Sequence, residues 1–218
     1  MIFLNKDGTP ILHAMIEAIQ KNKGYLSEID GQIGDGDHGV NMNKGFSIFA
    51  KWLEKNPVGF SEGLSHLGEV LMSEIGGSMG SIYGTLFMGM AEALEGRQQI
   101  DQQAFPHMLQ AAREGVFEIV DARKGDKTLV DTLEPAIEAF EKATADGQGF
   151  ADALRSMTEA AEKGSSSTKE LEAKYGRSAR LGPRSIGVLD AGAVSCYLLL
   201  TAMREGVQQL LHERQDAL

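Results

Sequence analysis

The chain has 218 residues, of which 42% are apolar, and a formal net charge of −10 at pH 7. A chain of this length and composition can bury a full core, and a single domain covering residues 1–218 is its simplest organisation. The negative charge argues against a general binder of nucleic acids or membrane surfaces, because such proteins draw their affinity from clustered Lys and Arg. Any anionic ligand must therefore be met by local positive charge.

Three features predict a cytoplasmic protein. Cys196 is the only cysteine, so no internal disulfide can form. The first ten residues lack the basic-then-apolar layout of a secretory signal. The longest apolar stretch, residues 191–203, is too short to cross a bilayer and is interrupted by Ser195 and Thr201. No membrane span is expected.

Apolar residues recur at helical spacing along nearly the whole chain, and alternating strand patterns are absent. The sequence therefore predicts an all-α fold of about eight helices, in a single compact domain. The first two helices are expected at residues 9–24 and 40–55. A third begins at a Ser61 cap and ends at Gly76-Gly77, and a fourth carries the apolar residues from Ile82 to Leu94. The remaining helices are expected at residues 102–122, 130–145, 151–163 and 191–212.

Local signals indicate where several of these helices begin or end. Thr9 followed by Pro10 is typical of an N-cap and a first-turn proline, and Asp190 is expected to cap the last helix. The serine-rich run from Gly164 to Thr168 is expected to be a solvated loop that interrupts the seventh helix before residues 169–175.

An acidic run follows the first expected helix. Asp30, Asp35 and Asp37 lie within eight residues and are set among glycines. Like charges this close repel one another unless a cation lies between them. Mg²⁺ is the expected ion, because it prefers hard oxygen ligands and completes its shell with water and substrate phosphates. The alternative is an Asx-rich surface turn that binds nothing.

Two familiar motifs do not account for this run. Gly34-x-Gly36-x-x-Gly39 matches the dinucleotide fingerprint in form, but a helix precedes it, and the intervening aspartates would repel phosphate. No frame places acids and glycine as an EF-hand requires. The P-loop pattern is absent from the chain.

Other segments could meet an anion. Gly76-Gly77-Ser78-Met79-Gly80-Ser81 would place free N–H groups at a helix N-terminus, although glycines there are often only caps. Positive charge comes from the run Lys124 to Thr128 and from Arg177, Arg180 and Arg184, which lie within eight residues. The arginines suit a mobile flap that contacts phosphate, and a solvated basic loop is the alternative. Among the histidines, only His38 is a functional candidate.

Taken together, these segments resemble the nucleotide-binding L subunit, or the equivalent C-terminal domain, of dihydroxyacetone kinases. The resemblance spans almost the whole chain and rests on four segments in the same order. They are Ile33-Gly34-Asp35-Gly36-Asp37-His38-Gly39-x-Asn41-Met42, Gly76-Gly77 with the following Ser-Met-Gly, Gly125-Asp126-Lys127-Thr128, and Gly176-Arg177 with Leu181-Gly182-x-Arg184-Ser185-Ile186-Gly187.

The resemblance implies an antiparallel barrel of eight α-helices with ADP or ATP bound at one rim. It implies two Mg²⁺ ions held by Asp30, Asp35 and Asp37, with no catalytic residue beyond that metal and nucleotide site. The arginine loop would form a lid in which Arg184 is the lid arginine. The implied nucleotide contacts are His38, Asn41, Gly77, Ser78, Met79, Lys127, Arg177 and Arg184.

In this family a separate K subunit or domain holds the ketose covalently through a histidine, and nothing in the chain matches that part. The implied partners are therefore a K subunit and, in one branch, a histidine phosphocarrier (M subunit) that draws on phosphoenolpyruvate; in the other branch ATP is the exchangeable donor. A homodimer is a further expectation. Asp190-Ala191-Gly192-Ala193 and Met79 depart from the family pattern, which leaves open the donor and the choice between dihydroxyacetone and erythrulose.

Two other functions compete with a kinase component. An adaptor that retains the fold could bind a K-like protein or a transcription factor, but it would need no metal cluster. A phosphatase acting on small phosphate esters would release inorganic phosphate without any K subunit.

Overall fold

The computed structural model describes residues 1–216, with side chains described for residues 1–214. This part of the chain contains eight α-helices, which confirms the predicted all-α class. Their bounds are α1 Thr9–Ile33, α2 His38–Leu53, α3 Phe60–Glu74, α4 Gly77–Ala93, α5 Ala104–Ile119, α6 Val130–Ala145, α7 Phe150–Ser167 and α8 Ala191–Asp216. Among these described helices, none is long and apolar enough to span a membrane.

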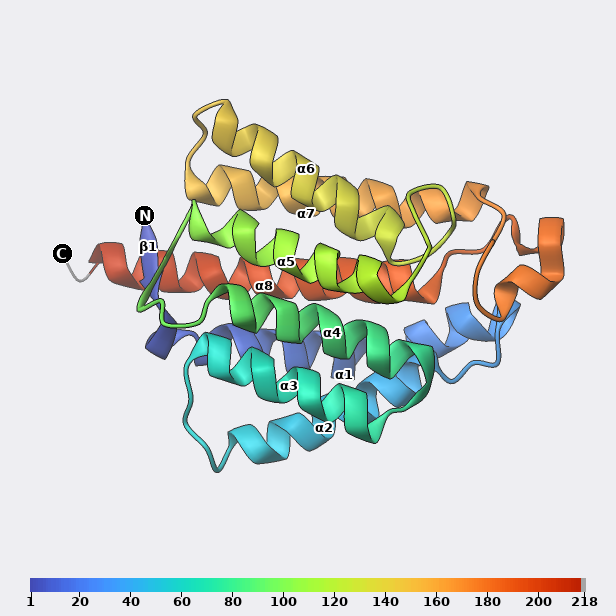
Figure 1. Ribbon diagram of the computed structural model, residues 1–218, viewed down its shortest axis with the longest axis horizontal. Coiled ribbons are helices and arrows are strands. Elements are labelled where there is room, and N and C mark those ends of the chain that lie inside the picture. Colours follow the sequence, from blue (N-terminus) through green and yellow to red (C-terminus); the bar gives the residue numbers. More distant parts are fainter. Residues whose placement is uncertain (217–218) are drawn as a thin grey trace.

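The helices form a closed ring in chain order. Each helix from α1 to α7 packs against the next one, and α8 packs against both α7 and α1. Successive helices run in opposite directions (Figure 1). The connections after α1, α3, α5 and α7 consequently lie at one end of the ring, whereas both termini lie at the other end (Figure 1). We call the first of these ends the loop rim.

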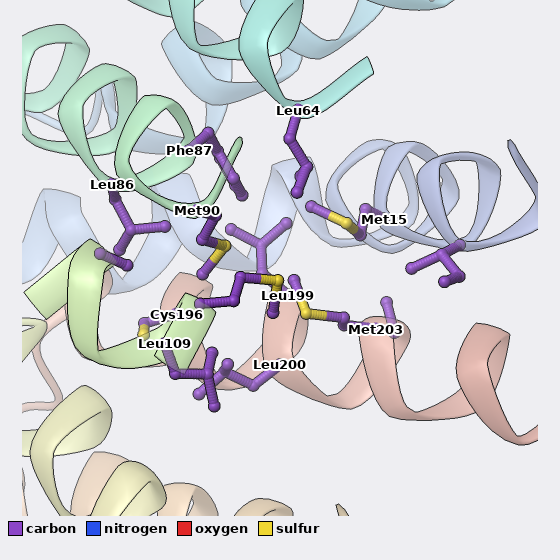
Figure 2. Packing of buried hydrophobic residues seen from close by; sticks show 14 of the residues in the cluster. Met15, Leu64, Leu86, Phe87, Met90, Leu109, Cys196, Leu199, Leu200 and Met203 are labelled. Carbon is purple, nitrogen blue, oxygen red and sulfur yellow. The ribbon is translucent and has the colours of Figure 1, made fainter. Parts of the chain in front are cut away.

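The core lies inside the ring. Side chains from α1, α3, α4, α5 and α8 point into the same interior, as Figure 2 shows for Met15, Leu64, Phe87, Leu109 and Leu199. Each of these side chains is buried. Because every helix contributes one apolar stripe to a shared interior, burial of these stripes stabilises the whole ring together.

Two short strands were missed by the sequence prediction. β1 (Ile2–Leu4) pairs with β2 (Gln99–Asp101) in antiparallel fashion, with Ile2 opposite Asp101. Three residues per strand are too few to show the alternation on which strand prediction depends. The pair joins the N-terminus to the α4–α5 connection and buries Phe3 and Ile100.

Two predicted caps and one helix end were wrong. Helix α1 continues past Gly24 to Ile33, because Leu26 and Ile29 extend its buried stripe. The residue before α1 is Gly8, and the Thr9 hydroxyl instead donates to the carbonyl of Val58 at 2.9 Å.

The cap predicted at Ser61 is also not formed. Helix α3 begins at Phe60, and the backbone N–H of Ser61 donates to Asn5 Oδ1 at 2.9 Å. The first turn of α3 is therefore capped by a residue distant in the sequence, which local cap rules cannot detect.

The serine-rich run is helical, not a solvated loop. Helix α7 includes residues 164–167, and only the short 3₁₀ turn Thr168–Glu170 follows it, so the segment expected at residues 169–175 is not a helix. Gly164 lies so close to the backbone of Asp131 and Thr132 on α6 that an added Cβ would collide with it. This close approach of α6 and α7 buries Ser165 and keeps the run ordered.

The remaining boundaries follow the predictions closely. Helix α6 occupies the expected residues 130–145, and Pro135 lies within it. Asp190 caps α8 as predicted, since its Oδ2 accepts the backbone N–H of Ala193 at 2.8 Å.

Candidate functional site

The three predicted aspartates meet at the loop rim. Asp30 lies in the last turn of α1, and Asp35 and Asp37 lie in the connection to α2. One carboxylate oxygen of each lies within 4.8 Å of the others. Gly36, at φ +75°, provides the left-handed backbone that turns the chain between the two later aspartates.

The protein compensates only part of the negative charge of these carboxylates. Burial and the neighbouring charges of Asp35 and Asp30 raise the pKa of Asp37. The backbone N–H of His38, at the start of α2, donates to Asp30 Oδ2 at 3.2 Å. The Asn41 side chain provides a hydrogen bond that stabilises the ionised form of Asp37. The cluster thus offers several hard oxygen donors that still repel one another, which is the donor set that Mg²⁺ prefers.

Arg177 reaches this cluster from the loop between α7 and α8. Its Nη1 forms an ion pair with Asp35 Oδ2, although the arginine side chain is 65% exposed. Arg184 is exposed in the same loop, within the 3₁₀ segment Ser178–Ser185. The ion pair shows that the loop can bring a guanidinium to the acidic cluster, where a phosphate would add to the contacts.

The His38 ring takes part in a buried hydrogen-bond chain. Its Nε2 lies 2.9 Å from Ser195 Oγ, and that hydroxyl lies 2.6 Å from Tyr83 OH. Both hydroxyls also lie 3.1 Å from the carbonyl oxygen of Gly192. Burial lowers the pKa of His38 to about 4, so the ring is neutral at pH 7. The His38 side chain therefore anchors the start of α2 to α8, and the backbone of His38 remains at the loop rim.

Sequence reasoning missed Tyr83 and Ser195 as parts of the site. The one available signal was a hydroxyl inside the otherwise apolar start of α8. Nothing local connects that hydroxyl to Tyr83 on α4, because the two residues are 112 positions apart.

The glycine turn lies at the same rim, at the start of α4. Gly76 and Gly77 have φ +69° and +64°, and an added Cβ would meet no atom within 4 Å at either position. Their need for glycine is therefore conformational, and the space beside them is open. Gly77 and Ser78 are exposed, whereas Met79 packs partly against the core. The exposed N–H groups of this first turn can receive an anion.

Lys127 does not join the acidic cluster. Its side chain is buried, and Nζ donates to the carbonyl oxygens of Thr168, Leu171, Ser185 and Val188. Its ammonium group is therefore already engaged by backbone, in contrast with the direct nucleotide contact expected from the sequence.

Fold and site together define a class of protein: an α-helical ring with an acidic cluster, an arginine loop and a helix N-terminus at one rim. The chain belongs to the DAK2 domain family, whose pattern matches residues 32–205. That match includes Asp35 and Asp37, and Asp30 lies just before it.

Two relatives match over most of their own length. The chain is 37% identical to the ADP-binding subunit DhaL of the PEP-dependent dihydroxyacetone kinase 1 of Listeria innocua, over 86% of this chain and 89% of that one. It is 36% identical to the corresponding ADP-binding subunit of Escherichia coli, over 81% of this chain and 84% of that one.

A solved structure shares the fold. The dihydroxyacetone kinase of C. freundii in complex with AMP-PNP and Mg²⁺ superposes with a TM-score of 0.67 at 21% identity. The superposition covers 89% of this chain and 33% of that longer one.

Proposed function

We propose that this chain is the nucleotide-binding subunit of a dihydroxyacetone kinase. It would bind ADP or ATP at the loop rim and pass a phosphoryl group through this site to a short ketose held by a separate K subunit. The single observation that carries the proposal is the meeting of Asp30, Asp35 and Asp37 within 4.8 Å at the rim that Arg177 also reaches. Support comes from the relatives named as ADP-binding subunits, which the chain matches over most of their length.

The three carboxylates would hold Mg²⁺, and we propose two ions. Mg²⁺ bound there would neutralise phosphate oxygens and stabilise the charge that shifts during phosphoryl transfer. Two divalent ions would also exceed the charge of the three carboxylates, which explains how an acidic loop can bind an anionic nucleotide.

The remaining groups of the rim would bind and orient the nucleotide. We assign contacts to the backbone at His38, to Asn41, and to the first turn of α4 at Gly77, Ser78 and Met79. Arg177 and Arg184 would contact phosphate from the loop between α7 and α8. No protein nucleophile is required, because positioning and charge neutralisation account for most of the catalysis of phosphoryl transfer.

The proposed partners are a K subunit that carries the ketose and, as donor, either a histidine phosphocarrier protein or ATP. The acceptor is dihydroxyacetone, with erythrulose as the alternative ketose. A homodimer and a cytoplasmic location remain part of the proposal.

One experiment tests the proposal and separates the donors. The chain is purified, any retained nucleotide is identified by mass spectrometry, and dihydroxyacetone, a K subunit and ATP are then supplied. Turnover with ATP indicates the exchangeable branch. Tightly held ADP, with turnover only after a phosphorylated histidine phosphocarrier is added, indicates the other. Absence of Mg²⁺-dependent nucleotide binding and of turnover with either donor would refute the kinase function and favour an adaptor.

A further inference from the structure

Lys127 occupies a cage of four backbone carbonyl oxygens. The distances from Nζ are 2.7 Å to Thr168, 3.1 Å to Leu171, 2.8 Å to Ser185 and 2.5 Å to Val188. An ammonium group has only three N–H donors, so the four oxygens surround it as they would a small cation. The side chain is 1% exposed.

The four carbonyls come from both ends of one loop. Thr168 and Leu171 lie where the chain leaves α7, and Ser185 and Val188 lie just before α8. We call the residues between them, 172–184, the arginine segment, because it contains Arg177, Arg180 and Arg184. A single ammonium group thus joins the start of the loop to its end.

Few other hydrogen bonds join these two ends. The backbone N–H of Gly187 donates to the carbonyl of Lys169 at 2.7 Å, that of Ala173 donates to Ser185 Oγ at 2.9 Å, and that of Asp190 donates to Thr168 Oγ1 at 3.0 Å. Each of these is a single neutral hydrogen bond. The Lys127 ammonium group, in contrast, contacts four carbonyl oxygens and carries a positive charge. Charge-assisted hydrogen bonds are about twice as strong as neutral ones.

The connection between α5 and α6 is built to present this lysine. Lys127 has φ +61°, a left-handed backbone conformation that is strained for a residue with a side chain. The conformation is held by Asp131, whose carboxylate accepts the backbone N–H groups of Gly125 at 2.5 Å and Thr128 at 2.8 Å. Strain maintained in this way is typical of positions where the side-chain direction matters.

The same connection also contacts the arginine segment directly. Lys174 Nζ lies 2.6 Å from Asp126 Oδ1, and the Lys174 backbone N–H donates to the Asp126 carbonyl at 3.2 Å. Arg177, three residues further along, forms the ion pair with Asp35. Contacts therefore lead from Lys127 and Asp126 through the segment to the acidic cluster.

We propose that Lys127 is a positioning residue that fastens both ends of the arginine segment, so that Arg177 and Arg184 are held over the cation and nucleotide site. The inference rests on the proposed function for its catalytic consequence. It replaces direct nucleotide contact as the role of this lysine. Without the ammonium, four carbonyls would face one another in a buried cage, and the loop would open to hydrate them.

Trypsin tests the anchoring without any nucleotide, because it cleaves after lysine and arginine, and the arginine segment contains both. In Lys127→Met, we expect cleavage after Arg177, Arg180 and Arg184 to accelerate at least about tenfold, since opening exposes the segment. Cleavage at sites in the rest of the ring should change much less. Lys124→Met is the matched control, because Lys124 is exposed and pairs only with Glu138 at the surface. Equal cleavage rates in Lys127→Met and wild type would overturn the proposal.

A second measurement connects the anchor to the site. Release of MgADP, followed by stopped flow with a fluorescent ADP analogue, should be at least about tenfold faster in Lys127→Met than in Lys124→Met. If wild-type protein binds no MgADP, the proposed function fails, while the trypsin result still decides whether Lys127 anchors the segment. Faster cleavage with unchanged release would overturn the positioning role.

Chemical rescue separates the cation in the cage from a general loss of stability. Propylammonium matches the part of the side chain that Lys127→Ala removes, so it should restore slow cleavage, whereas propanol should not. If Lys127→Met does not fold, the same measurements are made on Lys127→Arg, which keeps the charge but places a planar fork where a compact ammonium fits. Wild-type behaviour of Lys127→Arg, or equal rescue by propanol, would contradict the proposal.

Discussion

At the scale of single residues, the site depends on charges that the fold places close together. Asp30, Asp35 and Asp37 share a small volume, and Arg177 is the one cation that forms an ion pair with them among the described residues. That ion pair is exposed, so it adds little stability. The cluster is consequently suited to bind a cation more than to stabilise the fold.

Asp35→Asn should abolish Mg²⁺-dependent ADP binding. A proposed metal ligand is lost, and since even outer-shell changes reduce metal affinity about 10- to 100-fold, the loss here should be at least a hundredfold. The unfolding free energy without Mg²⁺ should stay the same or rise slightly, because one of three repelling charges is removed. Isothermal titration and urea denaturation measure the two effects, with Asp152→Asn, at a surface ion pair on α7, as control. Undiminished MgADP binding would contradict the metal assignment.

Asp190 should make stability depend on pH. Burial raises its pKa to about 6 from 3.8, against the opposing effects of the Ala193 N–H and the Lys127 charge. The folded state therefore binds more protons than the unfolded state between these values, and this group's contribution to the unfolding free energy falls as pH rises through 6. The full effect is on the order of 3 kcal/mol.

Asp190→Asn tests this sign, because the amide can still accept the Ala193 N–H and does not ionise. The unfolding free energy of the variant minus that of wild type should increase between pH 4.5 and pH 7.5, by about 2 kcal/mol. Urea denaturation across this range measures it. Asp121→Asn, at an exposed position, should give a difference that is constant with pH. A constant difference for Asp190→Asn as well would show that its carboxylate is not destabilised in the fold.

At the scale of the elements, the close approach of α6 and α7 determines how the α7–α8 loop begins. Gly164 allows α7 to touch the α6 backbone and to continue through the serine run to Ser167. Thr168 then presents its carbonyl to Lys127 and its Oγ1 to the backbone N–H of Asp190 at 3.0 Å. The contact between α6 and α7 thus determines where the loop that carries the arginine segment begins.

Gly164→Ala should destabilise the protein although alanine favours helices. The added methyl would meet the α6 backbone, with Thr132 Cα at 3.2 Å, and a helix must shift to relieve the overlap. We expect a loss of about 2 kcal/mol in the unfolding free energy. Gly24→Ala on α1 is the matched control: an added Cβ there meets nothing within 4 Å, so a gain of about 0.5–1 kcal/mol is expected. Equal effects of the two changes, measured in urea, would contradict the close contact.

At the scale of the whole molecule, the closed ring joins distant helices into one core. α8 packs against α1, α6 and α7, and thereby connects the first and last parts of the chain. We propose from this that residues 1–218 unfold as one domain. Trp52, on α2, is the single tryptophan of the chain. Its fluorescence reports the unfolding of α2, which lies on the other side of the ring from α6 (Figure 1).

Phe140→Ala on α6 should lower the unfolding midpoint that Trp52 fluorescence reports. Phe140 is fully buried and stacks with Phe105 at 5.2 Å between ring centroids, so the truncation should cost about 3–5 kcal/mol. In a single cooperative unit, the fluorescence and far-UV circular dichroism transitions shift together. Lys142→Ala, at an exposed position of the same helix, should leave both in place. A tryptophan transition unaffected by Phe140→Ala would indicate two independent domains.

Local pattern was sufficient for most of the helices and for expecting the three aspartates to lie together. Apolar spacing determines which residues share one helix face, and so α6 and the core of most other helices follow from it. Asp30, Asp35 and Asp37 lie within eight residues of sequence. Few backbone torsions separate them, so a single connection between two helices can bring their carboxylates together. Family resemblance added the expected ring and rim.

Contacts between distant parts of the chain decided the rest. The helical serine run depends on α6, the start of α3 is capped by Asn5, and hydrogen bonds through Ser195 connect His38 to Tyr83. Lys127 shows most clearly what local sequence leaves undecided: the family resemblance implies a nucleotide contact, whereas four carbonyls more than forty residues away along the chain hold its ammonium group. A side chain's role depends on which groups surround it, and packing brings those groups from elements that local sequence does not connect.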